Sequence, residues 1–283
     1  MIKLVECPRD AMQGIHEFIP TEKKIEYINT LLKVGFDTID FGSFVSPKAI
    51  PQMADTEDVL KGLDLSNTKS KLLAIVGNSR GAEVALQHDE ISYLGFPFSV
   101  SETFQRRNVN SSIARSLDRV ESINNLCTKA NRELVVYVSM GFGNPYGEPW
   151  NFEIVSYWVE ELIELGIKAI APSDTIGIAN RASISYLFKN LIPAYPQVGF
   201  GAHLHTTPDT WEDKVRAAYK NGCTRFDGAI RGFGGCPMAM DELTGNMPTE
   251  NLVAFFDKEN VELGIDREAL NEAIRMATEV FPN

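Results

Sequence analysis

Eight short apolar segments alternate with longer amphipathic segments along the whole chain, a pattern typical of strands separated by helices. Within 283 residues, eight such strands favour a (β/α)8 TIM barrel over an open doubly wound sheet. The predicted strands are IKLVEC (2–7), TIDFGSF (38–44), KLLAIV (71–76), EISYLGF (90–96), ELVVYVSM (133–140), KAIAPSDT (168–175), VGFGAHLH (198–205) and TRFDGAIRG (224–232). Since no Gly/Ser-rich or Pro-rich linker divides the chain, we predict one α/β catalytic domain over residues 1–283, with a helical segment appended from about Asp266.

Helix boundaries support this alternation. A helix is predicted at 21–34, where Thr21 can serve as the N-cap after Pro20. A second is predicted at 152–165, where apolar residues recur at helical spacing. Three predicted helices end at a glycine that tolerates the left-handed cap conformation: Gly35, Gly166 and Gly222.

The charge balance narrows the choice of partner. The chain has 27 Lys and Arg against 38 Asp and Glu, a formal net charge of −11, which argues against nucleic acid as a partner. No stretch approaches the roughly 20 apolar residues that span a bilayer, so we expect no membrane association. The four cysteines include no C-x-x-C pair, and the N-terminus has neither an apolar signal region nor an arginine-rich leader. These features predict a reduced, cytoplasmic protein.

In a TIM barrel the chemistry lies at the carboxyl ends of the strands, where this chain carries an H-x-H segment. His203 and His205 are two residues apart in a predicted strand, so both imidazoles project from the same face. Two interpretations have equal weight: a pair of polar residues at a strand end, or two ligands of one metal ion. If the barrel closes, Asp10 and Asn246 can add oxygen ligands, a set that suits Mg²⁺ or Mn²⁺ better than structural zinc. A metal-dependent amidohydrolase would need its H-x-H early and further histidines later, which this chain lacks.

Two further polar residues are candidates for catalysis. Arg9 precedes Asp10 and can form a structural salt bridge or stabilise a developing oxyanion. Cys236 lies in the glycine-rich loop GFGGCP (232–237), where a small core residue and a reactive acid/base thiol are the alternatives, and we favour the thiol.

Together these segments resemble 3-hydroxy-3-methylglutaryl-CoA lyase, a family within the metal-dependent lyase and Claisen-condensing TIM-barrel superfamily. The resemblance extends over nearly the entire chain, and its SFVSPK-x-x-PQM and GGCP segments are lyase-like rather than synthase-like. The segments that carry it are VECPRDAMQG (5–14), SFVSPKAIPQM (43–53), NPYG (144–147), SDTIG (173–177), HLH (203–205), GFGGCP (232–237) and TGNMPTE (244–250).

The resemblance implies a role for each matching residue. Asp10, His203, His205 and Asn246 match the metal ligands of the family, Arg9 its catalytic arginine and Cys236 its catalytic cysteine. Asp40 stands where the family has a glutamate important for activity, and Asp174 matches an active-site aspartate. The resemblance also suggests a homodimer.

The implied reaction is cleavage of 3-hydroxy-3-methylglutaryl-CoA, or of a close 3-hydroxyacyl-CoA analogue, and with the former the products are acetyl-CoA and acetoacetate. His203, Asp40 or Asp174 would relay the hydroxyl proton, Arg9 would stabilise the enolate, and Cys236 would protonate the acetyl-CoA carbon. Because CoA carries phosphates, Lys48, Arg106 and Arg107 are candidate substrate contacts, although each is more often a solvated surface cation.

The chain departs from the family pattern at Ala11, Gly14, Asp40 and Thr206, which leaves the acyl group of the substrate open. Thr206 stands where the family has an aspartate, so a carboxylate that would support the histidines is predicted to be missing. Two other functions are consistent with the pattern: a Claisen-type synthase acting on a 2-oxo acid, and a non-catalytic acyl-CoA-binding paralogue.

Overall fold

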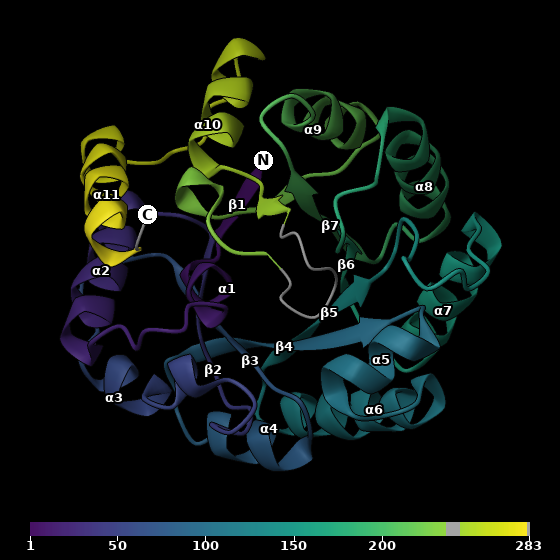
Figure 1. The fold of residues 1–283 in the computed structure, drawn as a ribbon, viewed down its shortest axis with the longest axis horizontal. Helices are drawn as coiled ribbons and strands as arrows, with labels where there is room; N and C mark the ends of the chain where they lie inside the picture. The colour runs from purple at the N-terminus through teal and green to yellow at the C-terminus, as the bar shows by residue number, and fades with distance from the viewer. Residues whose placement is uncertain (236–243, 282–283) are drawn as a thin grey trace.

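The computed structural model describes residues 1–235 and 244–281, in which eight parallel strands form a closed barrel surrounded by helices (Figure 1). The strands pair in the order β6-β5-β4-β3-β2-β1-β8-β7, and pairing of β6 with β7 closes the barrel. Their bounds are β1 (Lys3–Glu6), β2 (Thr38–Ser43), β3 (Lys71–Ile75), β4 (Ile91–Ser99), β5 (Glu133–Ser139), β6 (Ala169–Asp174), β7 (Gly199–Thr206) and β8 (Arg225–Gly228). The predicted (β/α)8 barrel is confirmed, although β4 is longer and β8 shorter than predicted.

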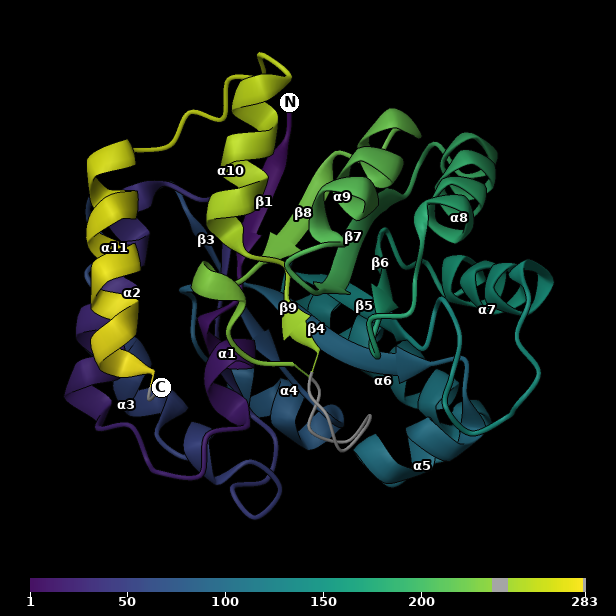
Figure 2. The same ribbon diagram turned by 45° about the horizontal axis from the view of Figure 1, so that its top comes forward.

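The helices form the outer layer (Figure 2). Their bounds are α1 (Pro8–Gln13), α2 (Thr21–Val34), α3 (Thr56–Lys61), α4 (Ser79–Ala85), α5 (Glu102–Val109), α6 (Ile113–Lys129), α7 (Phe152–Glu164), α8 (Arg181–Ala194), α9 (Trp211–Lys220), α10 (Thr249–Lys258) and α11 (Arg267–Val280). Two short 3₁₀ turns, η1 (Pro51–Met53) and η2 (Ile230–Gly232), lie between them. No helix in the described ranges combines the length and apolar character that a membrane crossing requires.

The three glycines predicted to end helices all have left-handed backbone conformations. Their φ angles are 81° at Gly35, 84° at Gly166 and 93° at Gly222, which confirms the prediction. The predicted N-cap role of Thr21 is wrong, because Thr21 is the first residue of α2 and its hydroxyl donates to Asp55 Oδ2 at 2.8 Å. The hydroxyl bonds a neighbouring loop rather than its own helix.

The C-terminal helix begins where the sequence predicts it. The Asp266 side chain accepts hydrogen bonds from the backbone N–H groups of Glu268 and Ala269, both at 2.9 Å, and so caps α11. The helix then packs beside α2, and the Phe281 ring that follows it meets Tyr27 edge-on at 5.6 Å between centroids. The appended segment therefore covers part of the outer helical layer.

Strand register determines which residues meet at the rim. Between β7 and β8, His203 aligns with Asp227, and a two-residue strand, β9 (Gly245–Asn246), pairs antiparallel with the end of β7. This pairing aligns Asn246 with His205. An apolar cluster inside the barrel forms the base beneath these polar residues: Leu73, Ile75, Val135, Tyr137, Ala169 and Ala171.

Candidate active site

A cavity of about 210 Å³ opens at the carboxyl ends of the strands. Its wall contains both polar and apolar residues, and the polar ones include Arg9, Asp10, His203 and His205, which were predicted from the sequence. The polar wall consists of Arg9, Asp10, Gln13, Asn108, Ser139, Ser173, Thr175, His203 and His205. The apolar wall consists of Val45, Ala49, Ile50, Ile75, Pro97, Phe104, Val109 and Tyr137.

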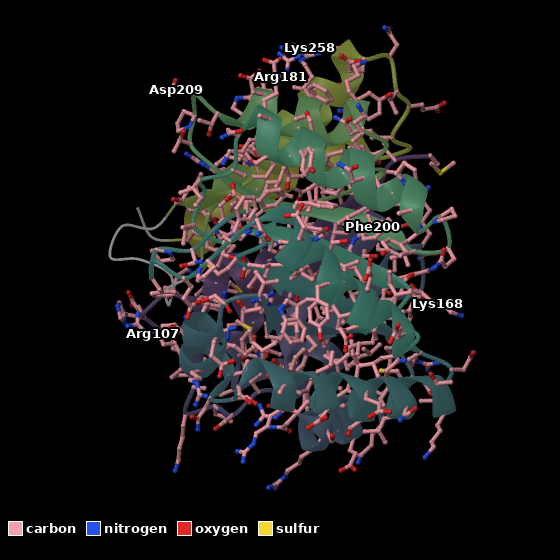
Figure 3. The ribbon with its side chains drawn as sticks, turned by 90° about the vertical axis from the view of Figure 1, so that its right-hand side faces the viewer. Arg107, Lys168, Arg181, Phe200, Asp209 and Lys258 are labelled. Carbon is pink, nitrogen blue, oxygen red and sulfur yellow. The ribbon has the colours of Figure 1, made fainter. Side chains whose placement is uncertain are left out.

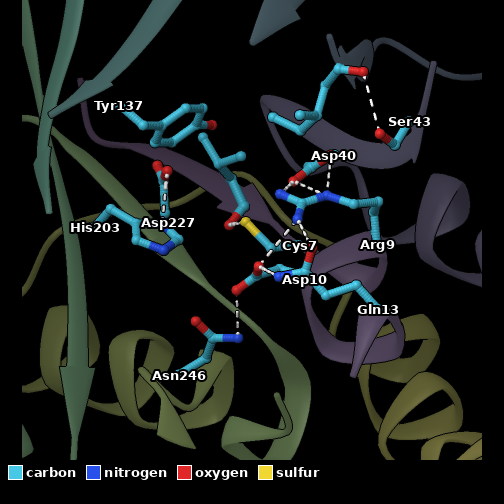
Figure 4. Close-up of polar contacts among 12 residues, drawn as sticks. Cys7, Arg9, Asp10, Gln13, Asp40, Ser43, Tyr137, His203, Asp227 and Asn246 are labelled. Atoms are coloured by element: carbon cyan, nitrogen blue, oxygen red, sulfur yellow. Dashed lines mark hydrogen bonds and ion pairs between the residues drawn. The ribbon is translucent and has the colours of Figure 1, made fainter. Parts of the chain in front are cut away.

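Arg9 and Asp10 come from α1, which follows β1 directly. Pro8 occupies the first turn, where a missing N–H leaves no helical hydrogen bond unmade. The buried Arg9 guanidinium donates from Nη1 to Asp10 Oδ1 at 3.0 Å and to Gln13 Oε1 at 2.8 Å (Figure 4). On its other side, Nε donates to Asp40 Oδ2 at 3.0 Å. The guanidinium therefore joins a carboxylate of the cavity wall to a carboxylate in β2.

Asp40 is 1% exposed and lies behind Arg9, outside the cavity wall formed by the described residues. Burial raises the pKa of Asp40 to about 6, although the Arg9 guanidinium opposes the rise. The Arg9 side chain therefore lies between the cavity and Asp40, a candidate proton acceptor.

The two histidines project from β7 into the cavity, as their spacing predicts. Their ring centroids are 5.5 Å apart. Nδ1 of His203 lies 3.3 Å from Asp227 Oδ2, and the Tyr137 ring meets the His203 ring edge-on at 5.4 Å. Burial would lower the pKa of His203, but the hydrogen bond and charge of Asp227 outweigh it and raise that pKa. Burial and the adjacent His203 lower the pKa of His205 to about 4.

Asn246 reaches the site through β9. Its Nδ2 donates to Asp10 Oδ2 at 2.8 Å and to the Phe233 carbonyl at 2.9 Å. The side-chain oxygen is therefore the atom that can coordinate a metal ion. Gly234 is packed against the same group with φ of 87°, and a Cβ there would lie 2.7 Å from the Asp10 carbonyl and 2.9 Å from Asn246 Nδ2. Only glycine allows the loop to approach Asp10 this closely.

The donor set fits a divalent metal. One ligand atom each from Asp10, His203 and His205 lie within 4.8 Å of one another. Among the described residues, none meets Nδ1 of His205 with hydrogen-bond geometry, although this atom is buried. Burial would raise the pKa of Asp10, but Arg9 and the imidazoles hold it below its ordinary value and favour the carboxylate form. Oxygen and imidazole donors of this kind suit Mg²⁺ or Mn²⁺.

Asp174 is placed differently from the other predicted residues. It is 1% exposed at the end of β6 and lies outside the described cavity wall. Its Oδ2 accepts from Lys214 Nζ at 2.6 Å, and its Oδ1 accepts from the Ala179 N–H at 3.0 Å. Both carboxylate oxygens are therefore engaged away from the cavity.

The predicted phosphate contacts are exposed and lie outside the cavity wall in the described structure. Lys48 is exposed in the loop after β2, and Arg106 is paired with Glu102 at 2.6 Å. Arg107 stacks over the Tyr146 ring at 4.9 Å and projects near the rim end of the barrel, opposite the end that carries Lys168 (Figure 3). Cys236 lies outside the described residues.

Sequence reasoning missed Asp227 and Gln13. Asp227 lies within β8 and not after its last residue, so a prediction based on polar residues at strand ends does not include it. The available signal was a carboxylate next to Phe226 within a predicted strand, because a buried charge is costly unless it has a partner. Gln13 stands one helical turn after Arg9, and its Nε2 donates to Asp10 Oδ1 at 2.6 Å.

The departures from the family pattern leave the ligand cluster intact. Thr206 lies in β7 with its backbone paired to Gly245, and a carboxylate for His203 comes instead from Asp227. Ala11 is buried beneath Gly234, while Gly14 ends α1 in open space, where an added Cβ would have nothing within 4 Å. The carboxylate that Thr206 does not provide is thus supplied to His203 by Asp227 in the neighbouring strand.

A TIM barrel whose rim gathers an aspartate, two histidines and a buried arginine defines a barrel enzyme with a candidate divalent-metal site. The model of the HMGL-like family matches residues 2–277, and the chain belongs to that family. It is 36% identical over 272 residues to hydroxymethylglutaryl-CoA lyase YngG of Bacillus subtilis, covering 96% of this chain and 90% of that protein. It is 33% identical to the cytoplasmic 3-hydroxy-3-methylglutaryl-CoA lyase of Danio rerio, covering 96% and 81% of the two chains.

Solved structures agree with this assignment. The HMG-CoA lyase of Bacillus subtilis superposes with a TM-score of 0.92 at 35% identity, covering 98% of this chain and 93% of that one. The HMG-CoA lyase of Acinetobacter baumannii, in complex with coenzyme A and 3-methylmalate, gives 0.91 at 31% identity, covering 99% and 91%. The predicted family resemblance is confirmed.

Proposed function

We propose that this chain is a divalent-metal-dependent carbon–carbon lyase that cleaves 3-hydroxy-3-methylglutaryl-CoA to acetyl-CoA and acetoacetate. The observation that carries the proposal is the cluster of Asp10, His203 and His205 beside the buried Arg9, within a family of relatives named for this activity. Residues 1–283 would act as one catalytic domain. The cytoplasmic location and the homodimer stay predictions.

Asp10, His203, His205 and the oxygen of Asn246 would hold Mg²⁺ or Mn²⁺. When bound, the ion supplies Lewis acidity that polarises the hydroxyl and carbonyl oxygens of the substrate. Gln13 and Asn246 both donate to Asp10 and thereby fix the orientation of its carboxylate.

The protein's own groups would move the protons. The C3 hydroxyl proton passes to a base, for which His203 and Asp40 are the candidates. The C2–C3 bond then breaks, its electrons form the thioester enolate, and C3 becomes the ketone of acetoacetate. Arg9 donates a hydrogen bond to the enolate oxygen from its remaining Nη2 hydrogen, and Cys236 delivers one proton to C2, which balances the proton removed from the hydroxyl.

The apolar wall of the cavity suits the pantetheine arm of CoA. Val45, Ala49 and Ile50 come from the loop after β2, and Phe104 and Val109 from α5, so the arm would enter between these two segments. Lys48, Arg106 and Arg107 lie on the same two segments and remain candidates for the phosphates. This arrangement gives an acidic protein a local basic edge for an anionic ligand.

Purified protein should release acetoacetate from 3-hydroxy-3-methylglutaryl-CoA when Mg²⁺ or Mn²⁺ is added, and a chelator should stop the release. Turnover of another branched hydroxyacyl-CoA alone would keep the chemistry and discard the substrate. Condensation of an acyl-CoA with a 2-oxo acid would indicate the synthase. Binding of acyl-CoA without turnover would support the non-catalytic paralogue.

A further inference from the structure

Lys214 is a buried lysine that faces the barrel rim from outside. It lies in α9 and is 2% exposed. Its Nζ donates to Asp174 Oδ2 at 2.6 Å, to the His205 carbonyl at 2.8 Å and to the Gly177 carbonyl at 2.9 Å. An ammonium group has three donors, and all three are used.

This arrangement excludes a role in contacting substrate. The cation is compensated by one carboxylate, and its remaining hydrogens are taken by backbone oxygens, so the burial cost of the charge is offset locally. Neither Lys214 nor Asp174 belongs to the described cavity wall. The Lys214–Asp174 pair can therefore affect the reaction only through the backbone groups to which it is bonded, those of Gly177, Ala179 and His205.

The three acceptors lie on three parts of the site. Asp174 ends β6, directly between the wall residues Ser173 and Thr175. Gly177 lies in the turn after β6, and that turn contacts the segment leading to Asn246: the Thr244 hydroxyl donates to the Ile176 carbonyl at 3.4 Å. The third acceptor belongs to His205 itself.

The orientation of the His205 ring depends in part on its backbone. Within the described ranges, the Thr175 backbone is a polar group beside the ring, and no group meets Nδ1 of His205 with hydrogen-bond geometry. Its backbone is held by β9 on one side and by Lys214 at the carbonyl. The carbonyl carbon and Cβ are both bonded to Cα, so a shift of this carbonyl would also displace Cβ and the imidazole attached to it.

We propose that Lys214 is a positioning residue that, with Asp174, fixes the His205 backbone and thereby sets the metal affinity of the site. The proposal rests on the proposed function, since it requires His205 to be a ligand. Asp174 then acts as the partner of Lys214 and not as a proton relay.

The chain offers a matched control in a second buried lysine pair. Lys24 in α2 is 2% exposed and donates to Asp55 Oδ1 at 2.7 Å and to the Gln52 carbonyl. Its aspartate also accepts one further hydrogen bond, from the Thr21 hydroxyl. This pair resembles the Lys214–Asp174 pair in burial and bonding, but it holds no candidate metal ligand.

The test compares two charge-neutral double variants, Lys214→Met/Asp174→Asn and Lys24→Met/Asp55→Asn. Removing both charges together avoids an unpaired buried ion, so both proteins should fold. The dissociation constant for Mn²⁺ is measured by calorimetry on each full-length protein, at a temperature where melting curves show it fully folded. The Lys214 variant should bind Mn²⁺ about 10–100-fold more weakly than the unaltered protein, the usual effect of losing a group that orients a metal ligand. The Lys24 variant should stay within about twofold, since distant sites are nearly additive.

Unchanged Mn²⁺ affinity in the Lys214 variant would overturn the positioning role, and so would an equal loss in both variants, which would indicate general loosening of the fold. If the unaltered protein itself fails to bind Mn²⁺, the proposed metal-dependent function fails together with this proposal. If it binds Mn²⁺ and cleaves substrate while the Lys214 variant is unaffected, only the role of Lys214 is wrong.

Discussion

The two histidines of the H-x-H segment are held in opposite ways. His203 is held through its ring, by the Asp227 carboxylate 3.3 Å from Nδ1. His205 is held through its backbone, by β9 and by the Lys214 ammonium. The difference shows that two candidate ligands on one strand can be oriented by different elements, one by β8 and the other by β9 and α9.

The largest effect is expected at Asp10, whose carboxylate lies in one cluster with both histidines. Asp10→Asn removes the charged member of the ligand cluster and leaves Arg9 with a single carboxylate partner. A metal ion commonly contributes several kcal/mol to catalysis, so kcat should fall on the order of 10³-fold. Acetoacetate release at saturating Mn²⁺ measures this fall, with the exposed Asp58→Asn as control. Near-normal kcat in Asp10→Asn would remove Asp10 from the proposed ligand set.

The ring-side anchor can be broken separately with Asp227→Asn. This change removes the carboxylate from His203 and should weaken Mn²⁺ binding about 10–100-fold. It also leaves Arg225, whose side chain is 12% exposed, without the carboxylate whose Oδ1 lies 3.3 Å from Arg225 Nε, so the melting temperature should fall as well. Calorimetry with Mn²⁺ and a thermal melt separate the two effects.

Combining Asp227→Asn with the Lys214→Met/Asp174→Asn pair tests whether the two anchors are independent. If they are, the losses in Mn²⁺ binding free energy should add to within about 0.5 kcal/mol. A combined loss much smaller than the sum would mean that one rigid unit holds both histidines.

The contrast between the anchors also shows what the sequence can predict. The H-x-H spacing places both imidazoles on one face, because side chains alternate along a strand. The strand positions and glycine caps follow from hydrophobic period and from the need for positive φ. These are local properties, and each can be inferred from a few neighbouring residues.

The anchors themselves depend on register and on contacts between distant segments. Asp227 meets His203 because β7 and β8 align at that level, and no local pattern fixes this alignment. Asn246 reaches His205 through a two-residue strand that is too short to give a periodic signal. The sequence predicts that Asp174 faces the reaction because strand ends usually do, whereas its bond to Lys214, 40 residues away, has no local signal.

A smaller effect on metal binding is expected from Gly234→Ala, which disturbs Asp10 and the Asn246 side chain and leaves Asp227 and Lys214 in place. A Cβ at this position would approach the Asp10 carbonyl to 2.7 Å in a backbone conformation with φ of 87°. The strain should cost roughly 1–3 kcal/mol and weaken Mn²⁺ binding by up to about tenfold. Gly264→Ala is the matched control, since Gly264 also has positive φ, 65°, but nothing lies within 4 Å of its added Cβ. Equal loss of affinity in both would show that strain alone is responsible.

The smallest effect on metal binding is expected at Glu6, a fully buried carboxyl group that joins β1 to the segments flanking the glycine-rich loop. Its Oε1 accepts from the Ile230 N–H at 2.9 Å and its Oε2 from the Thr249 hydroxyl at 2.5 Å. Burial raises the pKa of Glu6 from 4.5 to about 8, so the folded state holds this proton more tightly than the unfolded chain does. The stabilisation is therefore complete below pH 4.5 and is lost as the pH rises through about 8.

Glu6→Gln should remove this pH dependence, because the amide keeps an acceptor for Ile230 and carries no charge at any pH. Its melting temperature should exceed that of the unaltered protein by roughly 2–8 °C near pH 8.5, and the two should converge near pH 5. The exposed Glu90→Gln is the control and should leave the pH profile unchanged. Since Glu6 contacts neither histidine anchor, Mn²⁺ affinity should stay within about twofold. A parallel pH profile in Glu6→Gln would mean that Glu6 is ionised in the folded protein, whereas a large loss of Mn²⁺ affinity would mean that β1 positions the ligands as strongly as Asp227 and Lys214 do.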